Sequence, residues 1–215
     1  MLPGPAKAPV SLRRKRIWTR IAHVISTIFN PFVTALVLFV IMSARVAHDT
    51  LDFWRWMLIS ISFTSLLPLL YILWLYLTDR ISDLDMSDRE ERAAVFGAFT
   101  VFYGLGTIVL AFMHGPAPLI ATMAGYTAST AGVQFITRYW KISTHALGIA
   151  APLVAVVYMY GARPLPFLVL IPIVCWARIY LKAHTLGQVI GGAALAASSV
   201  ALFFHLFGVQ LTPLE

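Results

Sequence analysis

The sequence predicts an all-α fold, a polytopic membrane bundle of about six to seven transmembrane helices. Of the 215 residues, 60% are hydrophobic and only 12% are charged, and the mean hydropathy is +0.82. Soluble domains carry about 25% charged residues. Apolar runs follow one another along the chain, most of them near the roughly 20 residues that a helix needs to cross a bilayer. The composition therefore favours an integral membrane protein over a soluble domain.

Seven apolar segments are the expected spans. The connections "HGPAP" and "GARPLP" are short and contain turn-forming residues, so neighbouring helices should be antiparallel. The sixth segment is short and carries Pro172, which leaves its ends least defined. Little chain remains outside the spans, so we expect a basic cytoplasmic tail over 1–20 and a single integral membrane domain over 21–215. The segments cover about 21–44, 53–77, 93–113, 117–137, 143–161, 166–181 and 186–207.

The distribution of charge predicts the orientation. The net charge is +7, and basic residues crowd the stretch "KAPVSLRRKRIWTR" before the first span. Such residues usually remain cytoplasmic. With seven spans, the N-terminus then shares the cytoplasmic side with the connections near 78–92, 138–142 and 182–185, and the C-terminus is exported. We expect the inner membrane of a bacterium or archaeon, no nucleic-acid partner and, with Cys175 alone, no internal disulfide.

Three polar clusters stand at span ends on the side predicted to be cytoplasmic. They are "DREER", "KISTHA" and "ARIYLKAHTLGQ". Two spans separate each cluster from the next, and an even number of crossings returns the chain to the same side. The clusters should therefore meet at one end of the bundle. Their candidate site residues are Arg89, Arg92, Ser143, Thr144, His145, Arg178, His184 and Gln188.

This set of side chains favours an anion over a metal ion. No acidic residue lies between Glu91 and Glu215, whereas metal sites use carboxylates or cysteines beside histidine. Arginine donors and the N-terminus of a helix are suited to phosphate. His145 should lie in the first turn of a helix, with Ser143 or Thr144 as its cap. We therefore expect a phosphate at the membrane surface as the ligand, and no metal or cofactor.

The third cluster resembles a motif of the type 2 phosphatidic acid phosphatase superfamily, which includes membrane lipid phosphatases and the vanadium haloperoxidases. That motif is S-R-x5-H-x3-D. Arg178, His184 and Gln188 reproduce its spacing, with Ala177 in place of the serine and Gln188 in place of the aspartate.

The other two motifs of this superfamily, P-S-G-H and K-x6-R-P, are partly present. The segment 142–145 ends in Ser143, Thr144 and His145 and is similar to P-S-G-H. Arg92 matches the arginine of K-x6-R-P, but Asp85 takes the place of its lysine and alanine follows Arg92. The order, spacing and sidedness of all three motifs resemble the family over roughly residues 53–207.

The resemblance implies metal-independent phosphoryl transfer in a helical bundle. By this analogy His184 attacks phosphorus and forms a phosphohistidine, and His145 protonates the leaving oxygen and later helps to activate water. Arg92 and Arg178 hold the equatorial oxygens of the phosphoryl group. Arg89 replaces the missing lysine, and Ser143 and Thr144 belong to the phosphate-binding set.

The departure at Gln188 leaves alternatives open. A glutamine oxygen can orient the His184 ring but brings no charge. Either an acid of the first cluster reaches the ring, or activity is reduced, or the chain keeps the fold without the chemistry. The acids concerned are Asp79, Asp83, Asp85 and Asp88.

These alternatives give three functional hypotheses. The leading one is a phosphatase acting on phosphatidate, phosphatidylglycerol phosphate or a prenyl diphosphate. The second is a non-catalytic membrane subunit or lipid-binding protein with the same pocket. The third is an intramembrane prenyltransferase, because Asp79 and Asp83 resemble half of its diphosphate–magnesium site. The expected partners are the lipid phosphate and membrane lipids; a homo-oligomer or a larger membrane complex stays open.

Overall fold

The computed structural model describes residues 10–84 and 88–212, and the regular structure of these residues is entirely helical. A π-helical turn joins α3 and α4, and a 3₁₀ turn precedes α8. The elements are α1 (Val10–Ile28), α2 (Pro31–Val46), α3 (Thr50–Ile61), the π turn (Ser62–Leu66), α4 (Leu67–Leu77), α5 (Arg89–Phe112), α6 (Ala117–Thr137), α7 (Thr144–Tyr160), the 3₁₀ turn (Leu165–Val169), α8 (Leu170–Tyr180) and α9 (Leu186–Leu206).

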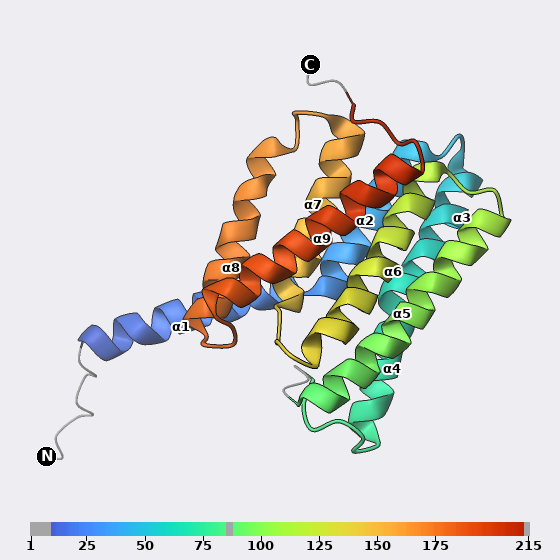
Figure 1. Cartoon of the computed structure of the whole chain (residues 1–215). Helices are drawn as coiled ribbons and strands as arrows, with labels where there is room; N and C mark the ends of the chain where they lie inside the picture. The colour runs from blue at the N-terminus through green and yellow to red at the C-terminus, as the bar shows by residue number, and fades with distance from the viewer. Residues whose placement is uncertain (1–9, 85–87, 213–215) are drawn as a thin grey trace, which may run out of the picture.

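Apart from α1, the helices form a bundle in which α6 and α7 are central (Figure 1). Helix α6 packs on α5 and α9, and α7 packs on α9 and α2. From α2 onward, with α3 and α4 taken as one continuous stretch, successive helices run in opposite directions (Figure 1). The connections that follow α4, α6 and α8 consequently lie at one end, and the C-terminal end of α9 lies at the other (Figure 1). This is the arrangement that the parity of the expected spans predicts for the three polar clusters.

The elements from α5 to α9 lie where the apolar segments were expected. Helices α6 and α9 match the segments 117–137 and 186–207 to within one residue at each end. The segment expected at 166–181 begins instead with the 3₁₀ turn, and α8 starts only at Leu170. Within residues 10–84 and 88–212, three continuous helical stretches are long and apolar enough to cross a membrane: Thr50–Leu77, Arg89–Phe112 and Leu186–Leu206.

The first expected span, 21–44, is not one continuous helix. The chain breaks at Asn30, and the helices on either side are bent by 46°. The residue before a proline disfavours helical backbone, and Asn30 is extended with its side chain accepting from the amide of Phe32 at 2.9 Å. Pro31 then starts α2, where its missing N–H costs nothing. If the bent pair is one span, the number of candidate spans rises to four.

The region expected to be a basic tail, 1–20, contains the start of α1. The described part of this region is helical from Val10, and α1 runs without interruption to Ile28 and leaves the bundle (Figure 1). Arg14, Arg16 and Arg20 are exposed on α1, and so is the apolar side chain of Val24. No end of a helix falls at residue 20, and the division into a tail and a membrane domain stays a prediction.

The candidate span Thr50–Leu77 contains the π turn because of Pro68. A proline inside a helix cannot donate to the carbonyl four residues earlier, here that of Thr64. The hydroxyl of Tyr103 donates to this carbonyl at 3.3 Å from α5. Local widening to a π turn is a common way to absorb such a break. The proline thus ties α5 to the middle of this span.

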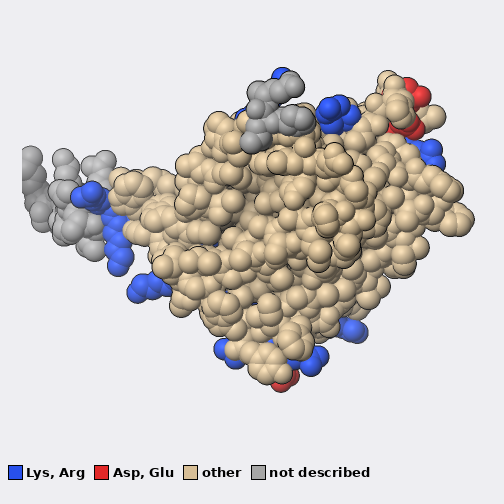
Figure 2. Space-filling model, turned by 45° about the horizontal axis from the view of Figure 1, so that its top comes forward, with Lys and Arg blue, Asp and Glu red and all other residues tan. Residues whose placement is uncertain are grey.

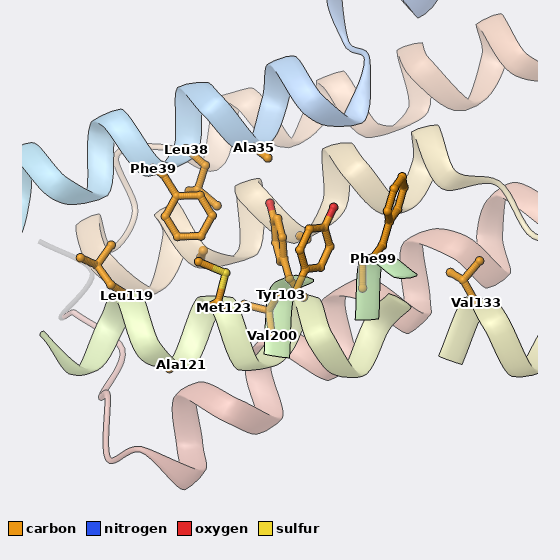
Figure 3. Packing of buried hydrophobic residues seen from close by; sticks show 14 of the residues in the cluster. Ala35, Leu38, Phe39, Phe99, Tyr103, Leu119, Ala121, Met123, Val133 and Val200 are labelled. Atoms are coloured by element: carbon orange, nitrogen blue, oxygen red, sulfur yellow. The ribbon is translucent and has the colours of Figure 1, made fainter. Parts of the chain in front are cut away.

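The core lies between α2, α5, α6, α7 and α9. In Figure 3, Leu38 and Phe39 of α2 face Met123 of α6, and Val200 of α9 packs from the opposite side of α6. Large apolar side chains also stand exposed on the outside of the bundle, among them Leu58, Ile108 and Ile190. In the view of Figure 2, lysine, arginine and acidic side chains lie at the periphery, with a broad uncharged surface between them. Such a surface fits a membrane protein.

Candidate functional site

A cavity of about 130 Å³ lies at the end of the bundle where the three polar clusters meet. Its mouth carries cationic and imidazole groups from four separate segments of the chain: Arg92, His145, Arg178 and His184. All four side chains are at most 8% exposed. Buried cations on this scale require partners or an anionic ligand. The cavity lining also includes Asn30, Pro31, Phe32, Ala35, Ile72, Leu84, Phe96, Phe99, Tyr103, Tyr126, Thr130, Lys141, Thr144, Leu147, Gly148 and Ala183.

The guanidinium of Arg92 is held by a backbone carbonyl and by an aromatic ring. It lies in the first turn of α5 and is 1% exposed. Its Nη2 donates to the carbonyl of Ile142 at 2.7 Å, and the guanidinium lies 5.3 Å from the ring centre of Phe96. The ring face attracts the cation. These contacts tie the first polar cluster to the second and fix the guanidinium at the cavity.

His145 lies in the first turn of α7, as expected. Ser143 is the N-cap of this helix, and its Oγ accepts from the amide of Ala146 at 3.3 Å. Ser143 is fully buried and does not line the cavity, whereas Thr144 does. The helix dipole favours an anion near these first residues. Of the two expected cap residues, Ser143 has the structural role and Thr144 faces the cavity.

Arg178 and His184 are brought together by the turn that ends α8. Lys182 has a positive φ of 56°. Its amide donates to the carbonyl of Ile179 at 2.9 Å, and the amide of Ala183 donates to that of Arg178 at 3.0 Å. This is the Schellman pattern that stops a helix. It turns the chain back so that His184 faces the cavity beside Arg178.

The side-chain oxygen of Gln188 contacts both the start of α9 and the ring of His184. Its Oε1 accepts from the amide of Thr185 at 2.9 Å and lies 3.3 Å from Nδ1 of His184. Thr185 in turn accepts from the amide of Gln188, which completes a capping box at the start of α9. An amide oxygen facing Nδ1 favours the tautomer that carries its hydrogen there. Nε2 of His184 then keeps the lone pair.

The electrostatic field at the mouth keeps His184 neutral. Burial, followed by the positive charges of Arg178 and Arg92, lowers the pKa of His184 to about 4. The hydrogen bond that the His184 ring donates to Gln188 raises the pKa, and Lys141 adds a smaller lowering effect. An imidazole with this pKa is unprotonated at neutral pH, which a nucleophile requires.

Some expected site residues lie elsewhere. Arg89 is exposed at the start of α5 and does not line the cavity. Asp88 caps α5 by accepting from the amides of Glu90 and Glu91, and Asp79 occupies the left-handed position that ends α4. Among the described residues no acidic side chain lines the cavity. Asp85, expected at the lysine position of the first motif, lies outside the described residues.

Lys141 and the aromatic residues of α5 also line the cavity, although they are not among the expected site residues. Lys141, a residue of the second polar cluster, lines the cavity beside Thr144. Four lining residues lie along one face of α5: Arg92 at the mouth, and Phe96, Phe99 and Tyr103 on the inner wall. Their spacing of three and four residues is that of a helix face, so the pattern was available in the sequence.

Close backbone contacts assemble the mouth. The amide of Ser143 donates to the carbonyl of Gln188 at 3.0 Å. A Cβ placed on Gly192 would collide with the carbonyl oxygen of Ser143, and one on Gly148 would lie 2.9 Å from Pro31. Glycine at these two positions lets α9 and α7 approach their neighbours. The ring of Trp140 lies against Gly187 and Gly191.

The described residues contain no group of three or more histidine, cysteine or acidic side chains that would hold a metal ion. The site is thus a buried cluster of arginine, lysine and histidine beside a helix N-terminus, which is chemistry for an oxyanion. In comparisons with known proteins, no family model, no curated protein and no solved structure matches the chain.

Proposed function

We propose that the chain is an integral membrane phosphatase of lipid phosphates, with its site at the cytoplasmic face. The observation that carries this is the convergence of Arg92, His145, Arg178 and His184 on one cavity. The resemblance of their motifs to the type 2 phosphatidic acid phosphatases supports the same reaction. The basic residues of α1 support the orientation.

In the first step Nε2 of His184 attacks phosphorus. A phosphorus–nitrogen bond forms as the bond to the leaving oxygen breaks, and His145 donates the proton that this oxygen takes up. Arg92 and Arg178 lie where they can hold the non-bridging oxygens, on which charge is spread in the transition state. The neutral state of His184 supports its role as nucleophile.

In the second step water attacks the phosphohistidine. His145, now deprotonated, accepts a proton from the water, and the bond between phosphorus and Nε2 breaks to release inorganic phosphate. The hydrogen on Nδ1 stays directed at Oε1 of Gln188 throughout. No step requires a metal ion.

Phosphate release from purified protein tests the proposal. The screen covers phosphatidate, phosphatidylglycerol phosphate and prenyl diphosphates, each with EDTA. We expect release that EDTA does not affect and that His184→Ala abolishes. His205→Ala is the matched control, since His205 is exposed at the C-terminal end of α9, away from the cavity. Full activity in His184→Ala would remove the mechanism.

A second candidate is a membrane protein that binds lipid phosphates without turnover. The absence of an acidic side chain from the described cavity lining, with Gln188 beside His184, favours it. Measurements of phosphate binding and phosphate release distinguish the two candidates. Saturable binding of phosphate with no release from any lipid phosphate, in wild type and in carboxylate variants of Gln188, would select the second.

A further inference from the structure

The cavity continues inward beyond the phosphate groups. Arg92 and Tyr103 both line it from α5. They are separated by about 16 Å along the helix, at a rise of about 1.5 Å per residue. The mouth is cationic, whereas the inner part is walled by Phe96, Phe99 and Ala35. A phosphate bound at the mouth would therefore direct its substituent along the bundle axis, into an aromatic interior.

The inner part is narrow. An engineered cavity of about 150 Å³ holds one benzene ring, and the whole cavity measures about 130 Å³. After a phosphate has filled the mouth, the remaining space admits one thin chain. The two chains of a diacyl lipid would not fit side by side.

The inner part also contains a tyrosine hydroxyl without a hydrogen-bond partner among the described residues. Tyr126 on α6 lines the cavity and is 7% exposed, and its hydroxyl has no hydrogen-bond partner among the described residues. The ring is held in place by the edge of Phe39, with ring centres 5.9 Å apart, and by Tyr103 at 6.0 Å. Buried hydroxyls are nearly always paired. The neighbouring hydroxyl of Tyr103 does have a partner, the carbonyl of Thr64.

We propose that the inner cavity is a subsite for the single chain of the substrate and that Tyr126 donates a hydrogen bond to an oxygen of that chain. This inference rests on the proposed function and narrows its substrate class. The ligand is a phosphate with one substituent chain that carries an ether, ester or hydroxyl oxygen at the depth of Tyr126. A purely hydrocarbon chain would leave the hydroxyl unpaired.

The experiment is an oxygen scan of phosphonates, which resist hydrolysis. The ligands are water-soluble alkylphosphonates of one length in which an ether oxygen replaces one methylene at successive positions, with methylphosphonate as a probe of the mouth. The ether isomers share one composition, so differences in Kd report position. Isothermal titration calorimetry on the full chain in detergent measures Kd for wild type, Tyr126→Phe and Tyr103→Phe.

We expect one position, or two adjacent ones, to bind about fivefold tighter than the others, as for one net hydrogen bond. Tyr126→Phe should abolish this preference. Tyr103→Phe is the matched control, because it removes a hydroxyl from the same cavity that already has a partner, and it should keep the preference.

Three results would overturn the inference. They are a flat scan in wild type, a preference that survives in Tyr126→Phe, and a preference lost equally in both variants. A flat scan would indicate that water pairs the hydroxyl. If methylphosphonate binds in any of these cases, the proposed function stands and only the inner subsite fails. If methylphosphonate does not bind, the proposed function fails, and this inference with it.

Discussion

Gln188 has one acceptor oxygen for two donors, the amide of Thr185 and the ring of His184. A carboxylate in the same place would accept both and add a charge that stabilises a phosphorylated or protonated imidazole. We therefore predict that Gln188→Glu raises phosphatase activity about tenfold or more. In a serine protease, exchange of the corresponding aspartate for its amide costs ~10⁴ in turnover. Phosphate release at saturating substrate measures the effect.

Gln188→Asp is the control for reach. Its side chain is one methylene shorter, so it should keep the cap on Thr185 less well and orient His184 poorly. Equal or lower turnover in Gln188→Glu, in a variant that still binds phosphate, would contradict the idea that charge at this position limits the reaction.

His184 should titrate far below an ordinary histidine. Burial and the charges of Arg178 and Arg92 lower its pKa to about 4, against about 6.5 in an unfolded chain. Between these values the unfolded chain binds a proton that the folded chain does not. Stability contributed by the neutral ring is therefore complete above about pH 6.5 and falls as the pH drops toward 4. NMR of ring-labelled histidine measures this pKa, and Gln188→Glu should raise it.

At the residue scale, the spacing of residues in the sequence predicted the cationic groups of the mouth but not the aromatic residues of the inner cavity. Arg178, His184 and Gln188 were recognisable because charge and imidazole are rare in apolar segments. Tyr103 and Tyr126 were not recognised, because aromatic residues are common in membrane helices and only the folded cavity distinguishes them. Asp88 was considered as an acid that could reach His184, and its role as the N-cap of α5 was not predicted.

Among the helices, α9 approaches the α6–α7 connection most closely at Gly192. A methyl group there would collide with the carbonyl of Ser143, and backbone cannot move aside as a flexible side chain can. We predict that Gly192→Ala lowers stability by about 1–3 kcal/mol and weakens phosphate binding, because Ser143 caps the helix that carries His145. Thermal unfolding and phosphate titration measure the two effects.

Gly104→Ala on α5 is the matched control. A Cβ at Gly104 meets only Thr127 at 3.6 Å, an ordinary contact. Alanine is the better helix former, so this variant should be neutral or more stable by up to about 1 kcal/mol. If both substitutions behave alike, the close approach of α9 is not what holds the mouth together.

The helices themselves were largely predictable, and the exceptions have local causes. Apolar length placed α5, α6, α7 and α9 closely. It could not reveal the break at Asn30, because residues on both sides of it are apolar, nor the π turn before Pro68. In both cases a proline removes one backbone hydrogen bond and the chain finds a different local solution.

The charges of the whole molecule predict its orientation in the membrane. If seven segments cross, the α6–α7 connection and the C-terminal end of α9 lie on opposite sides, with the basic connection in the cytoplasm. Arg138 and Gln210 are exposed at these two places. In a Cys175→Ser background, Arg138→Cys should react with an impermeant maleimide only after the cells are opened, and Gln210→Cys should react in intact cells. Labelling of both positions from one side would contradict seven crossings.

Parity alone predicted that the three polar clusters meet, because it depends on the number of crossings and tolerates errors of a few residues at each end. The depth of the cavity could not be predicted in this way. It depends on which faces of α2, α5 and α6 turn inward, and these helices are apolar on most sides.

The order of the mouth's parts along the chain has a consequence for biogenesis. His184 directly precedes α9, and its partner Gln188 lies in the first turn of that last helix. If the chain is the proposed membrane phosphatase, Arg92 and His145 are synthesised well before the His184 ring gains its partner Gln188, which comes only with α9. In that proposal the phosphate site is completed only when α9 is in place, and a chain that stops before α9 would lack it.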